Sequence, residues 1–76
     1  LSKNFGNRKF KKRINRIDKE GNTPLILAVQ NNYYFIVNYL LINKANKNVK
    51  NKEGKDAFDF AKKNDNVKVM VLLRNF

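Results

Sequence analysis

With 76 residues and a formal net charge of +11, the chain is at most one small domain, and a strongly basic one. It contains no Cys and no His, which excludes disulfide frameworks, zinc sites and Cys- or His-based catalysis. No apolar run approaches the roughly 18 residues of a membrane span, and no apolar core follows the basic start as it would in a signal peptide. We therefore expect an intracellular, cytoplasmic protein without a transmembrane segment.

Residues 1–17 form a basic N-terminal segment. Its run KNFGNRKFKKRIN at 3–15 contains six Lys or Arg residues and no carboxylate, with Phe5 and Phe10 between the cations. Cations with interleaved aromatic residues suit a polyanion, either nucleic acid or anionic lipid. The other interpretation is a cap or partial repeat whose phenylalanines cover the module that follows. Because Asn and Lys are frequent along the whole chain, charge alone does not choose between the two.

The rest of the chain, 18–76, contains an internal repeat. The tripeptide KEG occurs at 19–21 and again at 52–54, an offset of 33 residues. At this offset Leu25 aligns with Phe58, and the apolar positions are shared more often than the polar ones. A shared apolar pattern at such a period indicates that a packing unit is repeated, and it predicts a helical repeat architecture.

The repeat divides the module into two units, 18–50 and 51–76. Towards the end of the second unit, a one-residue deletion in the turn near 64–66 improves the alignment of the two Leu-Leu pairs. We therefore expect the last helix to be shifted by one residue relative to its counterpart.

Each unit begins with a predicted short helix. Thr23 before Pro24 suits an N-cap with proline at the first helical position, and predicts a helix over 24–31. Asp56 is the equivalent N-cap of the second unit. Asp59 follows three residues later, beside the positive end of the helix dipole.

A turn and a second helix follow in each unit. Asn31 and Asn32 predict a tight turn in the first unit, since Asn tolerates the left-handed backbone better than most residues. The residues 64–66 predict the same turn in the second unit. Second helices are expected over 34–43 and 67–75, because the first of these apolar runs follows a helix and a turn.

Residues 18–50 resemble an ankyrin repeat, whose pattern is Asp, two free residues, Gly, then Thr-Pro-Leu-His with Ala following and a later Leu-Leu run. The matching residues are Asp18, Gly21, Thr23, Pro24, Leu25, Ala28, Val37, Leu40, Leu41, Ala45 and Asn48. Residues 51–76 resemble a final repeat through Gly54, Asp56, Ala57, Phe58, Ala61, Val69, Leu72 and Leu73. The resemblance implies an all-α fold, a solenoid fragment of helix-turn-helix units with β-turn tips.

The chain departs from the ankyrin pattern at several positions. Ile26 and Asp59 stand where the family has His, so the side-chain hydrogen bonds of that His are missing. Asn32 and Asp65 replace the turn glycine, and Lys44 replaces the glycine before the last alanine. We expect looser turns and a lower stability rather than a different fold.

The resemblance also implies a binding surface, made of the β-turn tips and the exposed side of each first helix. The residues that it places there are Lys19, Glu20, Asn22, Gln30 and Asn31 in the first unit and Lys52, Glu53, Lys55, Lys63 and Asn64 in the second. A polar, mainly cationic face of this kind suits an acidic segment of a protein partner. The alternative interpretation is that these residues are only solvated positions on a basic protein.

The expected function is non-catalytic protein–protein interaction as part of a larger protein. The nearest carboxylate pair, Asp56 and Asp59, is explained by helix capping, and the glycines are too scattered for a phosphate-binding loop. We expect no enzyme activity, no metal, no cofactor and no small-molecule substrate. Two alternatives remain: polyanion binding through 3–16 and the cationic face, and a regulatory or stabilising role towards an enzyme in the same parent chain.

The predicted helix within 33–42 is apolar nearly all round, which is typical of a helix buried on every side. By the family pattern, however, Phe35 and Ile42 face solvent, one heptad apart on the same stripe. We expect Phe10 or another part of a longer parent protein to cover them, as an extra interface. On this hypothesis Phe35→Glu lowers the melting temperature clearly.

Overall fold

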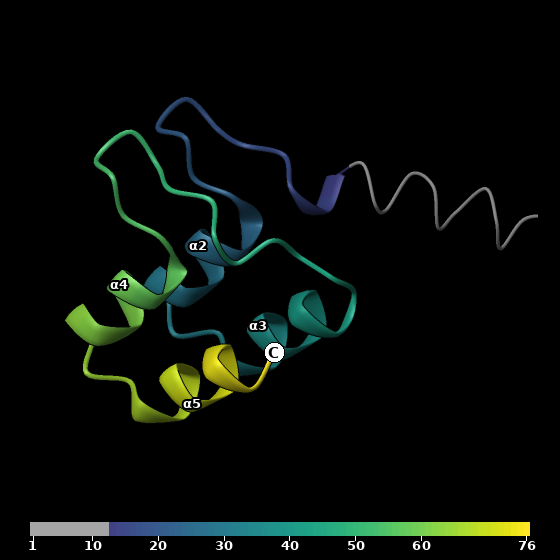
Figure 1. The fold of residues 1–76 in the computed structure, drawn as a ribbon, viewed down its shortest axis with the longest axis vertical. Helices are drawn as coiled ribbons and strands as arrows, with labels where there is room; N and C mark the ends of the chain where they lie inside the picture. Colours follow the sequence, from purple (N-terminus) through teal and green to yellow (C-terminus); the bar gives the residue numbers. More distant parts are fainter. Residues whose placement is uncertain (1–12) are drawn as a thin grey trace, which may run out of the picture.

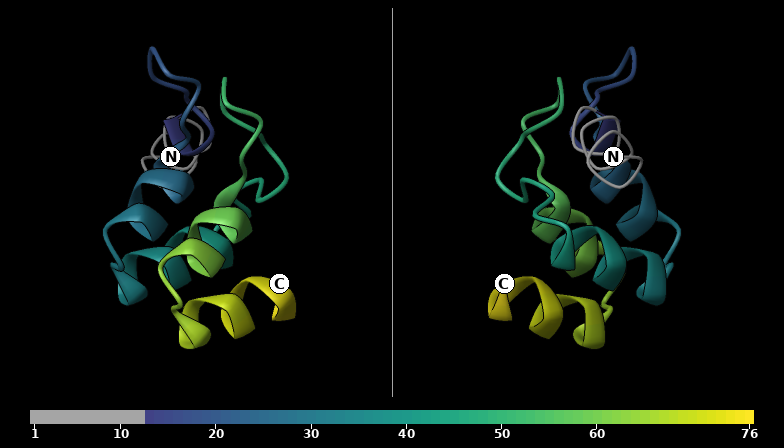
Figure 2. Two further views of the ribbon diagram at one scale, coloured as in Figure 1. Left: turned by 90° about the vertical axis from the view of Figure 1, so that its left-hand side faces the viewer. Right: turned by 90° about the vertical axis from the view of Figure 1, so that its right-hand side faces the viewer.

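The computed structural model describes residues 13–76, which contain helices and turns and no strand. The helices are α2 (Pro24–Gln30), α3 (Tyr34–Ile42), α4 (Ala57–Lys63) and α5 (Val67–Asn75). Helix α2 pairs with α3 and α4 pairs with α5, and the two pairs lie side by side (Figures 1 and 2). A protruding turn precedes each pair. We call the turns finger 1 (residues 17–23) and finger 2 (residues 50–56). The predicted all-α repeat architecture is confirmed.

Both first helices start as the sequence predicts. The Thr23 hydroxyl oxygen accepts a hydrogen bond from the backbone N–H of Ile26 at 3.1 Å, and proline occupies the first turn. In α4 the Asp56 carboxylate accepts from the N–H of Asp59, while the Asp59 carboxylate accepts from the N–H of Asp56, both at 3.0 Å. This reciprocal capping box satisfies N–H groups that have no partner inside the helix.

The turns adopt the left-handed backbone without glycine. Asn32 has φ 58° and Asp65 has φ 54°, and Lys44, after α3, has φ 72°. The first two residues lie 33 apart, as do the starts of α3 and α5. The predicted one-residue deletion is therefore wrong, since the offset of 33 persists through the turn.

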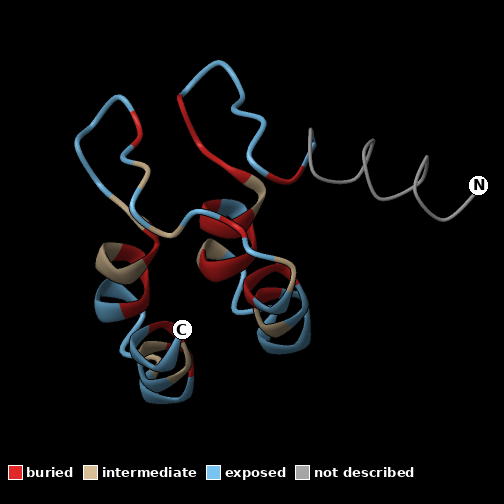
Figure 3. Ribbon diagram, turned by 45° about the vertical axis from the view of Figure 1, so that its right-hand side comes forward, coloured by how far each residue is buried: buried red, intermediate tan, exposed pale blue. Residues whose placement is uncertain are grey.

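The apolar core lies between the two helix pairs and within each pair. α2 packs against both α3 and α4, and α5 packs against α3 and α4. The core residues are Ile14, Leu25, Ile26, Ala28, Val29, Val37, Leu40, Leu41, Ala45, Ala57, Phe60, Ala61, Val69 and Leu73. Figure 3 shows in red that the buried parts of the four helices face one another. The small side chains of Ala28 and Ala61 leave room for each pair of helices to approach closely.

Polar side chains join the two units at both ends of the helices. The Asn51 amide donates to the Asn22 side-chain oxygen at 2.9 Å, in a buried position. The backbone N–H of Lys52 donates to the carbonyl of Glu20 at 2.9 Å, so the two fingers run side by side. At the opposite end the Asn64 amide donates to the last carbonyl oxygens of α2 at 3.2 and 3.3 Å.

The end of the basic N-terminal segment packs on the repeat units. Ile14 is 4% exposed and belongs to the core, and the Asn15 side-chain oxygen accepts from the N–H of Asn46 at 2.8 Å. The expectations for Phe5 and Phe10 lie outside the described residues.

α3 is not buried on every side, contrary to the expectation from its composition. Val37, Leu40 and Leu41 face the core, whereas Phe35 is 82% exposed and Ile42 is 57% exposed. The Tyr34 ring lies edge-on to Phe35, with ring centroids 5.4 Å apart, but both Phe35 and Ile42 remain largely open to solvent. Among residues 13–76, no helix has the length and apolarity needed to cross a membrane.

Candidate protein-binding surface

The two fingers present their charged side chains to solvent because their backbones are held from inside. The Asp18 carboxylate accepts from the N–H groups of Glu20 and Asn22, and the Asn51 side-chain oxygen accepts likewise from Glu53 and Lys55. The predicted finger residues that are exposed are Lys19, Glu20, Lys52, Glu53 and Lys55. Their location at the tips agrees with the pale blue finger ends of Figure 3.

The sequence-based prediction that Asn22 belongs to the binding surface is wrong. It is 8% exposed, and its side-chain oxygen is occupied by the Asn51 amide. A buried, hydrogen-bonded amide between the fingers is not available to a partner, so Asn22 belongs to the interface between the units.

A hollow of about 570 Å³ lies between finger 2 and α4. It brings together Lys55 and Lys63, which the sequence had indicated, with Lys62. Glu53, Gly54 and Asp59 complete the lining. Lys62 was missed, although its place in the last turn of α4, one residue before Lys63, was a usable signal.

The carboxylate of Asp59 is a poor competitor for the lysines of the hollow. Its pKa lies below the ordinary value, chiefly because the N–H of Asp56 donates to it, and Lys50 and Lys62 add Coulombic stabilisation while desolvation opposes the shift. The group stays ionised, but it is already engaged with the helix start. The three lysines of the lining therefore face two carboxylates, Glu53 and Asp59, so positive charge is in excess by one.

The remaining predicted residues lie at the ends of α2 and α4. Asn31 and Asn64 are exposed and Gln30 is half-buried. The Asn31 amide donates to the carbonyl of Leu27 at 2.8 Å, and Asn64 joins the two units. These amides support the helix ends.

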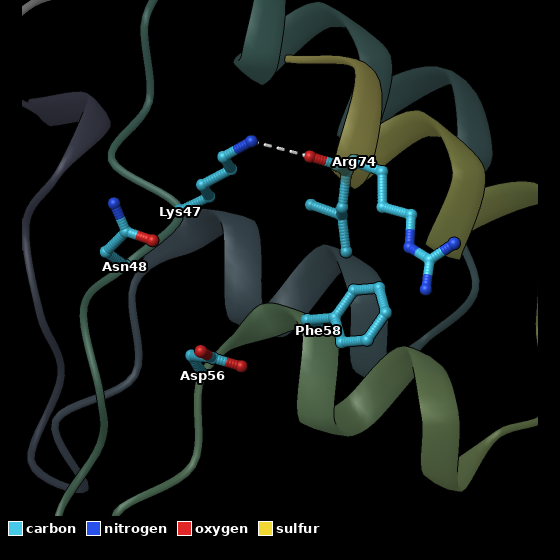
Figure 4. A pocket seen from close by; sticks show the side chains of 6 residues that line it. Lys47, Asn48, Asp56, Phe58 and Arg74 are labelled. Atoms are coloured by element: carbon cyan, nitrogen blue, oxygen red, sulfur yellow. Dashed lines mark hydrogen bonds between the residues drawn. The ribbon is translucent and has the colours of Figure 1, made fainter.

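A second hollow, of about 320 Å³, lies on the outer flank of the second unit (Figure 4). It is lined by Lys47, Asn48, Asp56, Phe58, Leu73 and Arg74. The Lys47 ammonium donates to the carbonyl of Leu73 at 2.7 Å, and the Arg74 guanidinium lies 5.8 Å from the centre of the Phe58 ring. Sequence reasoning had assigned no binding residue to this flank.

The helix pairs and protruding turns agree with the family to which the sequence is similar. The family model described as ankyrin repeats (many copies) matches residues 7–61. This is most of the chain, and the chain belongs to the ankyrin-repeat family. The comparison with curated proteins gives no significant match.

Domains of this family are generally protein–protein interaction modules, and they are typically non-catalytic. Within residues 13–76, no group of three or more acidic side chains is placed to hold a metal ion.

Proposed function

We propose that this chain is a non-catalytic recognition module that binds an acidic segment of a protein partner. The binding surface consists of the exposed finger residues Lys19, Glu20, Lys52, Glu53 and Lys55 and the hollow between finger 2 and α4. The observation that supports it most strongly is that Lys55, Lys62 and Lys63 come together around one shallow, open depression beside finger 2 and α4.

The charges favour an acidic partner over a basic one. In the hollow the carboxylate of Asp59 is held by the α4 N-terminus, so an incoming carboxylate meets mainly the lysines. Lysine ammonium groups at a rim of this kind increase the association rate and select the partner more than they add affinity. Lys63 and Asn64 extend the surface towards Gln30 and Asn31 of the first unit.

Charge reversal at two of these positions tests the proposal. We expect a protein captured by the immobilised wild-type chain from a lysate of the source cells to be lost with K52E/K63E. The matched control K44E/K68E changes the same number of charges on exposed residues away from this surface, and we expect it to retain the protein.

The same experiment distinguishes polyanion binding. Nuclease treatment or replacement of the lysate by anionic vesicles removes or mimics a nucleic acid or lipid partner. Binding that both double variants weaken equally, and that falls about a thousandfold or more between 50 and 200 mM salt, would refute recognition of a protein segment.

A further inference from the structure

The face of the first unit that contacts the second is apolar. Leu25 and Val29 of α2 are 0% exposed, and Leu41 of α3 is 4% exposed. α2 packs on α4, and α3 packs on α5. A unit of this chain therefore buries apolar side chains at these positions when another helix pair packs against it.

The same face of the second unit is polar. At the offset of 33, Leu25, Val29 and Leu41 become Phe58, Lys62 and Arg74. Two further buried positions become cationic at the same offset: Ile14, at the end of the N-terminal segment, corresponds to Lys47, and Asn22 of finger 1 corresponds to Lys55.

Two cations of this outer flank lie over the ring of Phe58. The Arg74 guanidinium lies 5.8 Å and the Lys62 ammonium 6.0 Å from the centre of the half-buried Phe58 ring. In Figure 4 the Arg74 side chain extends above and beside the Phe58 ring, and Lys47, on the other side of the view, donates to the carbonyl of Leu73 in α5. Stacking a helix pair here would bury these charges without partners, at a large cost in free energy.

The opposite flank shows the reverse. Phe60 of α4 and Val69 of α5 are 9% and 0% exposed, on helices that pack against α2 and α3 of the first unit. Their counterparts at the offset of 33 are Leu27 and Ile36, which are 38% and 50% exposed. The first unit thus carries, facing outward, the apolar positions by which the second unit stacks.

We propose that the helix stack is directional. Leu27 and Ile36 form an open stacking face that takes one more helix pair of the same kind, presenting a face like that of Leu25 and Val29. The flank of Lys62 and Arg74 is a cap that takes none. Terminal units of repeat proteins need such a polar outer face for solubility.

Tandem duplication within the full chain tests both halves. Duplicating residues 13–45 places the apolar face of one copy against Leu27 and Ile36 of the next, in register. We expect a single unfolding transition with a melting temperature about 10 °C higher. Duplicating residues 44–76 behind Phe76, also 33 residues, should leave the melting temperature of the natural part unchanged.

Point variants distinguish an effect on the contact between stacked units from an effect on the folding of a single unit. Ile36→Lys at the new junction of the front duplication should abolish the gain. In the natural chain the same substitution should change the melting temperature by no more than about 2 °C, because the side chain is exposed. Lys62→Val with Arg74→Leu should allow the rear duplication to gain stability.

Each duplication tests one half of the proposal, the cap or the stacking face. A rear duplication as stabilising as the front one overturns the cap. A front duplication without gain overturns the stacking face. If the front duplication does not fold, the natural-chain variant still decides, since a loss of more than about 5 °C with Ile36→Lys would mean that this side chain is already packed.

Discussion

The two repeat units share a backbone but not an environment, and the fingers show the difference most clearly. Gly21 and Gly54 both have left-handed φ values, 81° and 77°. A Cβ on Gly21 would lie 3.0 Å from the backbone nitrogen of Lys52, whereas one on Gly54 would have no neighbour within 4 Å. The local turn requires the glycine conformation in both fingers, but close packing constrains only the finger that has a neighbour behind it. The structural role of a residue in one unit therefore depends on whether a neighbouring unit packs against it, and the equivalent residue of the other unit does not reveal that role.

The largest expected effect on stability comes from exchanging the residues at one equivalent position, Val29 in the first unit and Lys62 in the second. Val29→Lys puts a charge where the side chain is 0% exposed, and we expect a loss of at least about 3 kcal/mol of unfolding free energy. Lys62→Val at the equivalent exposed position should cost less than about 0.5 kcal/mol. Urea unfolding of both variants measures the contrast, and similar losses would mean that the two flanks are not different.

A smaller effect is expected where the units meet at the fingers. Asn51→Asp removes the amide that donates to Asn22 at 2.9 Å and sets a carboxylate against that oxygen, so we expect a loss of about 2 kcal/mol. Asp18→Asn, the reverse exchange in finger 1, keeps the acceptor of both backbone bonds and loses only the charge, so we expect a smaller loss of stability at pH 7 than with Asn51→Asp. Chemical unfolding of the pair tests this, and equal effects would contradict the role of the Asn51 amide.

Acid should distinguish the fingers further. The pKa of Asp18 lies below its ordinary value, chiefly because the N–H of Asn22 donates to its carboxylate, with Glu20 adding to the effect and desolvation opposing it. A lowered pKa stabilises the fold above the unfolded-state value, about pH 4, and this contribution is lost as the pH falls through the folded-state pKa. Asn51 does not titrate.

An NMR titration from pH 7 to pH 2 checks this prediction. The amide resonance of Asn22 should shift with the protonation of Asp18, and that of Lys55 should not show the corresponding step. Asp18→Asn should abolish the step at Asn22. A step that survives in this variant would assign the titration to another group.

The smallest effect is expected at Phe35, where the sequence had suggested a covered interface. Phe35 is 82% exposed, and its counterpart at the offset of 33 is Lys68. Phe35→Glu should therefore change the free energy of unfolding by less than about 0.5 kcal/mol in this chain. A clear drop in the melting temperature would show that another part of the chain covers the side chain, as first expected.

Much of the fold could be predicted because its signals are local. Thr23 before Pro24, and Asp56 three residues before Asp59, determine helix starts through short-range hydrogen bonds. The period of 33 residues indicated how often the packing unit recurs. The left-handed turns were predictable because Asn and Asp tolerate that backbone conformation.

What could not be predicted depends on contacts between the units. Asn22 has the residue type and position of a surface contact, and only the pairing with Asn51 reveals that it is buried. The deletion was inferred from the Leu-Leu letters, whereas Val69 is buried because α5 packs sideways on α3. The hollow itself depends on α4 and finger 2 lying side by side, so its extent was not visible in the sequence, although the position of Lys62 next to Lys63 was a signal for that one residue.

The most direct test of the account is to map the bound partner on the chain. A ¹⁵N-labelled sample of the full chain is titrated with the acidic segment of the captured protein, and amide shifts are followed. We predict shifts concentrated at Lys52, Lys55, Lys62 and Lys63, extending to Gln30. Shifts concentrated on α3 around Phe35 and Ile42, or confined to residues 1–17, would contradict recognition through the fingers and α4.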